Sequence, residues 1–545
     1  MHENEEVSMS LKGQIEQSYQ ASVEGMDIPW MLGQWVANTP DKVCVIWCPF
    51  NGEEQSLTYS ELYEGARRLA TGLQQRGVAT GDFVLLHMDN SPEFIFSWYA
   101  CAMLGAVAVS TNTRSVARDL SYFAEVTEAV CCLTQPKFAR MIHDACPSLK
   151  FMALADTDAG EANPDLESIR AAISGISLAD LFADQPIEIR PPDSQANLSI
   201  QFTSGTTSRP KAVLWTHGNG IWAGKTSAQH YRLRRDDVTN VYMPLYHTNA
   251  QGYSMLATHW SGGTIVVQPK FSASRFWPVI MDHGVTWSSM IPFAVKAIME
   301  QPVPQHKIRL WSLGARVSPI EQHFGVDTLG LWGMTETLSH GTVADPDHLG
   351  PEMTIGRTAP GYETQIRNSD GSLCHPGEKG HFFIRGVRGV SLFKEYYRNP
   401  EANDKAFDED GWFDTGDIVR SDEDGWLYFS DRDKDMLKVG VENVAASEIE
   451  AVIMQTGLAA ECAVVGQEHY MLDEVPVVFV IPSPSGQELT SEEMEEQIIE
   501  HNKLNLPDFK VVRSVHIVDE LPRSTLEKIA KNVLRDRLTP ITEGK

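Results

Sequence analysis

The sequence lacks any apolar run long enough to cross a membrane. Its longest apolar runs, such as Tyr99 to Val109, fall well short of the ~20 residues that a membrane-spanning helix needs. The first six residues, Met-His-Glu-Asn-Glu-Glu, are acidic and do not form the basic and apolar regions of a secretory signal. We therefore expect a cytoplasmic protein without a membrane span.

Paired cysteines and an excess of positive charge are missing as well. The eight cysteines form no CxxC pair and have no neighbouring histidines at zinc spacing, so we expect reduced, buried thiols. With 45 Lys and Arg against 73 Asp and Glu, the net charge is −28, which disfavours nonspecific binding to nucleic acid or to an anionic membrane. No nucleic-acid partner is expected, and an anionic substrate must be held by local donors. The cysteines are Cys44, Cys48, Cys101, Cys131, Cys132, Cys146, Cys374 and Cys462.

The chain contains enough apolar sequence for a large core. Hydrophobic residues make up 42% of its 545 residues, and at about 150 residues per domain the length predicts three or four domain-sized units. A helix is expected over residues 57–77 and a strand over 82–87, and similar alternation continues to about residue 350. This pattern predicts an α/β fold with two layered units of mostly parallel strands. The apolar face of the first helix comprises Leu62, Ala66, Leu69 and Leu73.

Two changes in residue composition divide the rest of the chain. Residues 355–430 contain short strands punctuated by glycine and aspartate, which predicts a small antiparallel β subdomain at the end of a body spanning 1–430. The alternating charges of residues 431–435 do not pack in a core and predict a hinge or a solvated turn. Residues 436–545 are expected to form a small α+β domain. Its expected elements are a helix at 445–455, strands near 461–465 and 475–481, and a helix capped by Thr490 with Glu493.

The most informative segment is a loop crowded with small hydroxyl residues, Thr-Ser-Gly-Thr-Thr-Ser-Arg-Pro-Lys at 203–211. Glycine lets the backbone approach an anion, and consecutive N–H groups and hydroxyls supply donors, so the loop can hold phosphate. It is not a Walker A loop, because Pro210 precedes Lys211 and biases Arg209 toward extended geometry. The alternative is an ordinary solvated loop, and the rest of the chain decides between them.

Four further motifs follow this loop in a fixed order. They are Trp-Gly-Met-Thr-Glu at 332–336, Thr-Gly-Asp at 415–417, Arg432, and Lys528 within Leu-Pro-Arg-Ser-Thr-Leu-Glu-Lys-Ile. In this order the motifs closely resemble those of the adenylate-forming superfamily of acyl-CoA synthetases, adenylation domains and luciferases, and the resemblance covers roughly residues 30 to 535. Among these enzymes the pattern is most similar to bacterial ligases for small or medium-size acids, including the crotonobetaine/carnitine type.

The resemblance implies a nucleotide site for ATP and AMP. The hydroxyl-rich loop would hold the β- and γ-phosphates, with Lys211 stabilising the loop. Trp332 would stack on adenine, with Gly314 and Ala315 as the opposite wall, and Asp417 would accept from both ribose hydroxyls. Taken alone, Trp332 reads as a core residue and Asp417 as a turn residue. The nucleotide-binding residues implied are Thr203, Ser204, Gly205, Thr206, Thr207, Lys211, Gly314, Ala315, Trp332, Gly333, Asp417 and Arg432.

The resemblance also implies the catalytic groups. Thr335 would donate to the α-phosphate, and Glu336 would hold Mg²⁺, a hard cation that prefers oxygen ligands. Taken alone, Glu336 reads as a helix-cap carboxylate. A mobile ammonium at Lys528 can bridge the attacking carboxylate and the α-phosphate as charge develops, although an isolated lysine this near the end of a chain is ordinarily a solvated surface group.

One site must then serve two reactions, which in this family requires a rotation of the C-terminal domain. Lys434 occupies the position of the family's pivot, and the rotated domain would carry Lys528 away and form a thiol tunnel near Gly440 and Val441. Coenzyme A is the co-substrate that the resemblance implies.

Three positions depart from the family pattern by replacing a usual glycine. They are Ser208 in the phosphate loop, Val441 before Glu-Asn and Glu527 before the catalytic lysine. Each adds a Cβ at a permissive backbone position. Val441 would narrow the thiol tunnel or restrict the hinge, and Glu527 would place a carboxylate that competes for the charge of Lys528. The resemblance therefore supports adenylation more strongly than thioester formation.

The acid-binding pocket is the least defined part of the site. His247, in Pro-Leu-Tyr-His-Thr-Asn, matches the family's aromatic or histidine gate beside the carboxylate, and a hydrogen-bonded core histidine is the alternative. The remaining candidates mix polar and apolar character, and the fold decides which of them point inward. The pocket candidates are His247, Asn249, Arg316, Met334, Leu338 and His340.

The sequence thus predicts an ATP-dependent carboxylic acid:CoA ligase that forms an acyl-adenylate and releases AMP and pyrophosphate. Its expected partners are a small-molecule carboxylic acid, ATP, Mg²⁺ and CoA, with a homodimer left open. An enzyme that loads a carrier-protein thiol is the first alternative, and a degenerate nucleotide-binding regulator is the second. Amino acid activation is disfavoured, because no Phe-Asp-x-Ser element follows His247.

Overall fold

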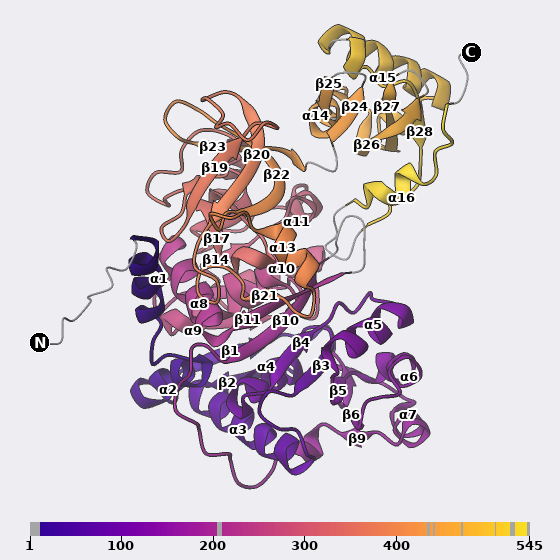
Figure 1. The fold of residues 1–545 in the computed structure, drawn as a ribbon. Coiled ribbons are helices and arrows are strands. Elements are labelled where there is room, and N and C mark those ends of the chain that lie inside the picture. Colours follow the sequence, from indigo (N-terminus) through magenta and orange to yellow (C-terminus); the bar gives the residue numbers. More distant parts are fainter. Residues whose placement is uncertain are drawn as a thin grey trace, which may run out of the picture. The chain divides into compact units, whose positions relative to one another are not determined.

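The computed structural model describes residues 11–541 apart from 204–209, 433–435, 440–441, 470–471, 507 and 524–528 (Figure 1). The chain divides into two compact units. One comprises Met1–Glu363 and Ile384–Phe413, and the other comprises Thr364–Phe383 and Asp414–Lys545. Because this division splits the segment 355–430 between the units, the domain boundary near residue 430 stays a prediction.

A mixed sheet of nine strands forms half of the first unit, in the order β18-β17-β16-β15-β14-β12-β13-β1-β2. The neighbours from β16 to β1 are parallel, and the strands at both ends add antiparallel pairs. The strands are β1 (Val43–Trp47), β2 (Gln55–Thr58), β12 (Val238–Val241), β13 (Thr264–Val267), β14 (Trp287–Ser289), β15 (Leu310–Gly314), β16 (Asp327–Gly333), β17 (His340–Val343) and β18 (Arg357–Thr358). The helices between them include α8 (His217–His230), the π-helix η2 (Asn249–Leu256), α9 (Ala257–Ser261), α10 (Ala273–Asp282), α11 (Pro292–Ile298) and α12 (Ser318–Phe324).

The second sheet of this unit has eight strands in the order β21-β11-β10-β4-β3-β5-β6-β9. Strands β10 to β9 in this order are parallel, and β11 and β21 join antiparallel. The strands are β3 (Phe83–His87), β4 (Val107–Ser110), β5 (Cys131–Thr134), β6 (Phe151–Leu154), β9 (Ile176–Ser177), β10 (Asn197–Thr203), β11 (Lys211–Thr216) and β21 (Glu395–Tyr396). The helices α5 (Ala117–Thr127), α6 (Pro136–Ala145) and α7 (Leu166–Ile173) bury apolar side chains in the same core cluster as these strands. The expected α/β layering is therefore confirmed.

The helix expected over residues 57–77 is α3 (Tyr59–Gln75). Thr58 caps its first turn in a capping box with Glu61, which satisfies backbone donors at the helix start. The four residues expected on its apolar face are all buried. Gly77 follows the helix with a φ of +85°, a conformation that glycine adopts at little cost.

The second unit contains two β-sheets. A four-stranded sheet in the order β19-β20-β22-β23 lies largely within it, with β22 and β23 antiparallel. A five-stranded sheet has the order β25-β24-β27-β26, with β28 beside β27. The predicted strands 461–465 and 475–481 are the centres of the longer β26 and β27, and the Thr490–Glu493 capping box is present. The elements are β19 (Glu363–Arg367), β20 (Lys379–Arg385), β22 (Phe413–Ser421), β23 (Leu427–Arg432), β24 (Met436–Val439), β25 (Glu442–Ala445), α14 (Ala446–Met454), β26 (Ala459–His469), β27 (Asp473–Pro482), α15 (Ser491–Asn505), β28 (Val515–Ile517) and α16 (Lys531–Arg535).

The sequence analysis made expectations about the state of the cysteines and about membrane-spanning helices. All eight cysteines are free, and all but Cys374 are buried. Among the helices of the described residues, none combines the length and the apolar character needed to span a bilayer.

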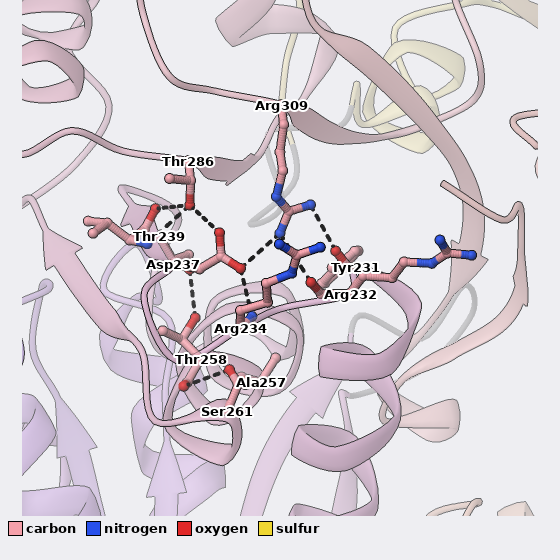
Figure 2. Close-up of polar contacts among 11 residues, drawn as sticks. Tyr231, Arg232, Arg234, Asp237, Thr239, Ala257, Thr258, Ser261, Thr286 and Arg309 are labelled. Carbon is pink, nitrogen blue, oxygen red and sulfur yellow. Dashed lines mark hydrogen bonds and ion pairs between the residues drawn. The ribbon is translucent and has the colours of Figure 1, made fainter. Parts of the chain in front are cut away.

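A buried carboxylate joins the end of α8 to the sheet beneath it (Figure 2). Asp237, which precedes β12, is 6% exposed. Its carboxylate pairs with Arg309 at 2.9 Å and accepts from the Thr286 hydroxyl at 2.6 Å and from the backbone N–H of Arg234 at 2.7 Å. Arg309 also donates to the carbonyl of Tyr231, which follows α8. The cluster fixes the start of β12, the strand that leads to His247.

We expect Asp237→Ala to lower the free energy of unfolding by about 2 kcal/mol, because it removes the partner of the Arg309 guanidinium and of the Arg234 backbone N–H. Asp236→Ala is the matched control, since this neighbouring carboxylate is exposed and such substitutions change stability by about 0.5 kcal/mol or less. Urea unfolding followed by tryptophan fluorescence measures both. Equal stability of the two variants would contradict this role.

Candidate active site

Several predicted site residues of the first unit lie at or beyond the carboxyl ends of neighbouring parallel strands of the nine-stranded sheet. Gly314 ends β15 and Ala315 follows it, while Gly333 ends β16. His247 lies six residues beyond Val241, the end of β12. Strands β12, β14, β15 and β16 are parallel neighbours, so these segments emerge at the same edge of the sheet. Ligands of open α/β sheets bind at this edge.

A short 3-10 turn, η3 (Thr335–Thr337), presents Glu336 and is held by contacts to its backbone. The carbonyl of Thr335 accepts from the indole N–H of Trp215 at 3.1 Å, and the carbonyl of Glu336 accepts from the backbone N–H of Phe393 at 2.9 Å. Leu338 then reverses the chain with a φ of +63°, which is uncommon for a residue other than glycine. These contacts hold the backbone of the turn in place.

The carboxylate of Glu336 is 3% exposed and accepts a hydrogen bond from the hydroxyl of Tyr396 at 2.9 Å. The ring of Tyr396 in turn lies under Lys211, whose Nζ is 4.5 Å from the ring centroid, a favourable cation–π distance. Burial and, secondarily, the Glu336 charge raise the pKa of Tyr253, so its phenol stays protonated. Tyr396 therefore connects Lys211, which follows the hydroxyl-rich loop, to Glu336, 125 positions later in the sequence.

Tyr396 was missed by the sequence analysis. Tyr396 lies on β21 and pairs with Val213 of β11. This pairing brings Tyr396 beside Lys211, which is also on β11. No spacing in the sequence links position 396 to position 336. An aromatic residue just before the helix-starting Asn-Pro of 399–400 was the only available signal.

Trp332, Gly314 and Ala315, the residues predicted to enclose adenine, lie at or just after the ends of β15 and β16. Trp332 is 7% exposed, and a Cβ at Gly341 would lie 2.8 Å from its indole, so the glycine makes room for the ring. Gly314 has a φ of +88°, and a Cβ built on it meets no atom within 4 Å. The end of β15 therefore borders open space, as a wall of a ligand site does. Ala315 follows it and is half-buried.

Asp417 and Arg432 belong to the second unit and are described within it. Asp417 is 8% exposed, and its backbone N–H donates to the Thr415 hydroxyl at 3.2 Å. In the antiparallel pair β22–β23, Asp417 lies opposite Arg432. The two predicted ribose-side residues thus share one position of a two-stranded ribbon.

The structure separates the pocket candidates into two groups. His247, Asn249 and Met334 are half-buried beside the strand ends. Leu338 and His340 are fully buried, and Arg316 pairs with Glu321 at 3.3 Å and donates to the carbonyl of Gly350.

His340 is held in a buried network of its own. Its Nε2 lies 2.7 Å from the Tyr231 hydroxyl, and its Nδ1 lies 3.1 Å from Nδ1 of His230. Burial, and after it the neighbouring His230, lower the pKa of His340 well below its usual value. The neutral, hydrogen-bonded imidazole of His340 is therefore part of the protein interior. Its ring centroid also lies 4.3 Å from that of Tyr253.

Several predicted positions lie outside the described residues. These are the loop positions Ser204, Gly205, Thr206, Thr207 and Ser208, the pivot Lys434, the tunnel residues Gly440 and Val441, and Glu527 with Lys528.

The layered fold and the Thr-Glu turn that Tyr396 joins to Lys211 are those of a protein of the adenylate-forming class. The model of the AMP-binding enzyme family matches residues 32–397, and that of the AMP-binding enzyme C-terminal domain matches residues 448–528. The chain belongs to this family of AMP-binding enzymes.

Relatives with assigned activities are similar over nearly the whole chain. The crotonobetaine/carnitine–CoA ligase of Escherichia coli O7:K1 is 33% identical over 511 residues, which cover 91% of this chain and 96% of that enzyme. The ligase of the same name from Escherichia fergusonii is 33% identical over 512 residues, with the same coverage of both chains.

Solved structures with bound AMP or ATP have the same fold. The O-succinylbenzoate coenzyme A synthetase of Bacillus subtilis in complex with AMP superposes with a TM-score of 0.79 at 26% identity, covering 94% of this chain and 100% of that one. ATP-bound MatB of Rhodopseudomonas palustris gives a TM-score of 0.79 at 25% identity, covering 94% and 99%.

Proposed function

We propose that this protein is an ATP-dependent carboxylic acid:CoA ligase that works through an acyl-adenylate and releases AMP and pyrophosphate. The observation that carries the proposal is the Lys211–Tyr396–Glu336 arrangement, which joins strands β11 and β21 to the turn after β16, in a chain 33% identical to CoA ligases over most of its length. The acid is small or of medium size in this proposal, as in the relatives with the most similar motifs.

In the first reaction, formation of the acyl-adenylate, the residues of the site have distinct roles. Thr335 donates to the α-phosphate, and Trp332 with Gly314 and Ala315 encloses adenine. The buried carboxylate of Glu336 fits Mg²⁺, because a hard cation prefers carboxylate oxygen and the Tyr396 hydroxyl already orients that oxygen. When bound, Mg²⁺ supplies positive charge to the phosphates of ATP.

The remaining roles concern the acid and the second reaction. His247, with Asn249 and Met334, borders the place of the acyl group. Asp417 and Arg432 bind the ribose, and Lys528 acts only in adenylation, after which rotation about Lys434 admits the thiol near Gly440 and Val441. The cytoplasmic location and the homodimer remain predictions.

Pyrophosphate release across a panel of carboxylic acids, with and without CoA, tests the proposal. We expect acid-dependent release of pyrophosphate and, with CoA present, formation of one acyl-CoA per AMP. Adenylation without any thioester on CoA would favour loading of a carrier-protein thiol instead. Nucleotide binding without acid-dependent pyrophosphate from any acid would favour the regulator.

Val441 offers a test of the thiol step. We expect Val441→Gly to speed CoA attack on preformed acyl-AMP and to leave adenylation nearly unchanged, because the substitution removes a branched side chain at a position where the family pattern usually has glycine. Single-turnover rates of the two half-reactions provide the measurement, with adenylation as the internal control. An unchanged or slower thiol step would show that the valine does not obstruct it.

A further inference from the structure

Three potential metal ligands from separate segments converge far along the chain from the nucleotide motifs. Cys48 directly follows β1, Glu54 directly precedes β2, and His283 directly follows α10. Their ligand atoms all lie within 4.8 Å of one another. His283 is 235 positions from Cys48, which is why the sequence, searched for histidines near cysteines, gave no indication of this cluster.

The contacts converge on one atom of the histidine. Nε2 of His283 lies 3.2 Å from Sγ of Cys48 and 3.4 Å from Oε1 of Glu54. A catalytic cysteine, histidine and carboxylate would instead use the two ring nitrogens in series, with the acid at Nδ1 and the thiol at Nε2. The geometry is that of ligands around a shared point.

We propose that Cys48, Glu54 and His283 bind one Zn²⁺ ion. With zinc bonds of about 2.3 Å to sulfur and about 2.0 to 2.1 Å to nitrogen and oxygen, tetrahedral geometry separates sulfur from nitrogen by about 3.6 Å and nitrogen from oxygen by about 3.3 Å. The observed 3.2 and 3.4 Å lie close to these separations. Sulfur, imidazole and carboxylate together favour zinc over magnesium or calcium.

The surroundings suit a partly open site. The Cys48 residue is fully buried, whereas the side chains of His283 and Glu54 are 12% and 53% exposed, so a water molecule has access to a fourth position. His283 also lines a cavity of 450 Å³, whose other lining residues include the oppositely charged Asp282 and Lys307. The guanidinium of Arg275 opposes the ion, but it is directed to Phe50, to whose carbonyl it donates at 3.1 Å.

Coordination exchanges one bond for another without a change of oxidation state. The S–H bond of Cys48 breaks, the sulfur–zinc bond forms, and the proton passes to solvent. The thiolate and the Glu54 carboxylate then balance the charge of the ion. Bound zinc would tie the β1–β2 connection to the end of α10.

Metal titration of the full chain without a polyhistidine tag tests the site. Zn²⁺ is added to chelator-treated protein in competition with a chromophoric chelator, and Co²⁺ is used as a spectroscopic substitute. We expect one tight equivalent and a sulfur-to-cobalt charge-transfer band. We expect Cys48→Ser to remove the band and weaken zinc binding by about 100-fold, and Glu54→Gln, at an exposed side chain, to weaken it by about 10-fold.

Cys374→Ser is the matched control, because Cys374 is half-buried and outside the cluster. It should keep both the band and the affinity. Circular dichroism establishes that each variant is folded, and Glu54→Gln keeps the test valid if the buried cysteine cannot be replaced. Zinc binding by the natural chain that is no tighter than in Cys48→Ser and Glu54→Gln would overturn the proposal, as would a cobalt band lost in Cys374→Ser.

Discussion

Lys528→Ala is expected to reduce acyl-AMP formation from acid and ATP by about 1,000-fold, the scale on which a preorganised charge stabilises a transition state. The thioester-forming reaction from supplied acyl-AMP and CoA should be largely spared, because the ammonium is needed only while the α-phosphate is attacked. Lys528 lies outside the described residues, and this expectation rests on the match of the C-terminal family model, which extends to residue 528.

Separate assays of the two half-reactions, pyrophosphate release and acyl-CoA formation from synthetic acyl-AMP, measure this split. Lys531→Ala is the matched control, because Lys531 is three residues away and pairs with Glu450 at 2.8 Å within the same unit. It removes the same charge without removing the proposed catalytic group, so adenylation should persist. Equal losses in both half-reactions of Lys528→Ala would contradict a role in one step only.

The parts of the fold that could be predicted from the sequence are those with local causes. The helix α3 has a capping box at Thr58, a periodic apolar face and a glycine stop at Gly77, and each of these signals lies within 20 residues of the others. The capping box of Thr490 and Glu493 was recognised for the same reason. Strand lengths were less accurate, because pairing between β26 and β27 extends both strands beyond their apolar centres.

The side-chain environment of the site could be predicted only in part. The Trp-Gly-Met-Thr-Glu motif places Glu336 at the end of a parallel strand, but its contact with Tyr396 depends on a strand added 60 positions later. His340 was grouped with the pocket candidates, of which the fold was expected to decide which point inward. The structure instead directs it to Tyr231 and His230, partners that are set by packing of α8 against the sheet and have no sequence signal.

The buried carboxylate of Glu336 is the group in the described part of the site whose charge we expect to matter most. Glu336→Gln keeps the shape of the side chain, and its amide oxygen can still accept from Tyr396, so the fold of η3 should be retained. A neutral amide is a poorer ligand for Mg²⁺ than a carboxylate. We therefore expect pyrophosphate release to fall by about 100-fold, as for the loss of one electrostatic contact to a transition state, and more magnesium to be needed for half-maximal rate.

A magnesium titration of the pyrophosphate-release rate separates the charge of Glu336 from its packing. Tyr396→Phe is the matched comparison, because it removes the 2.9 Å hydrogen bond to Glu336 and keeps both the carboxylate and the ring under Lys211. This variant should lose less activity than Glu336→Gln, since the metal ligand remains while only its orientation is loosened. If Glu336→Gln showed an unchanged magnesium dependence, the carboxylate would not be a metal ligand. If Tyr396→Phe were the more damaged of the two, the hydrogen bond rather than the charge would be the essential feature of this turn.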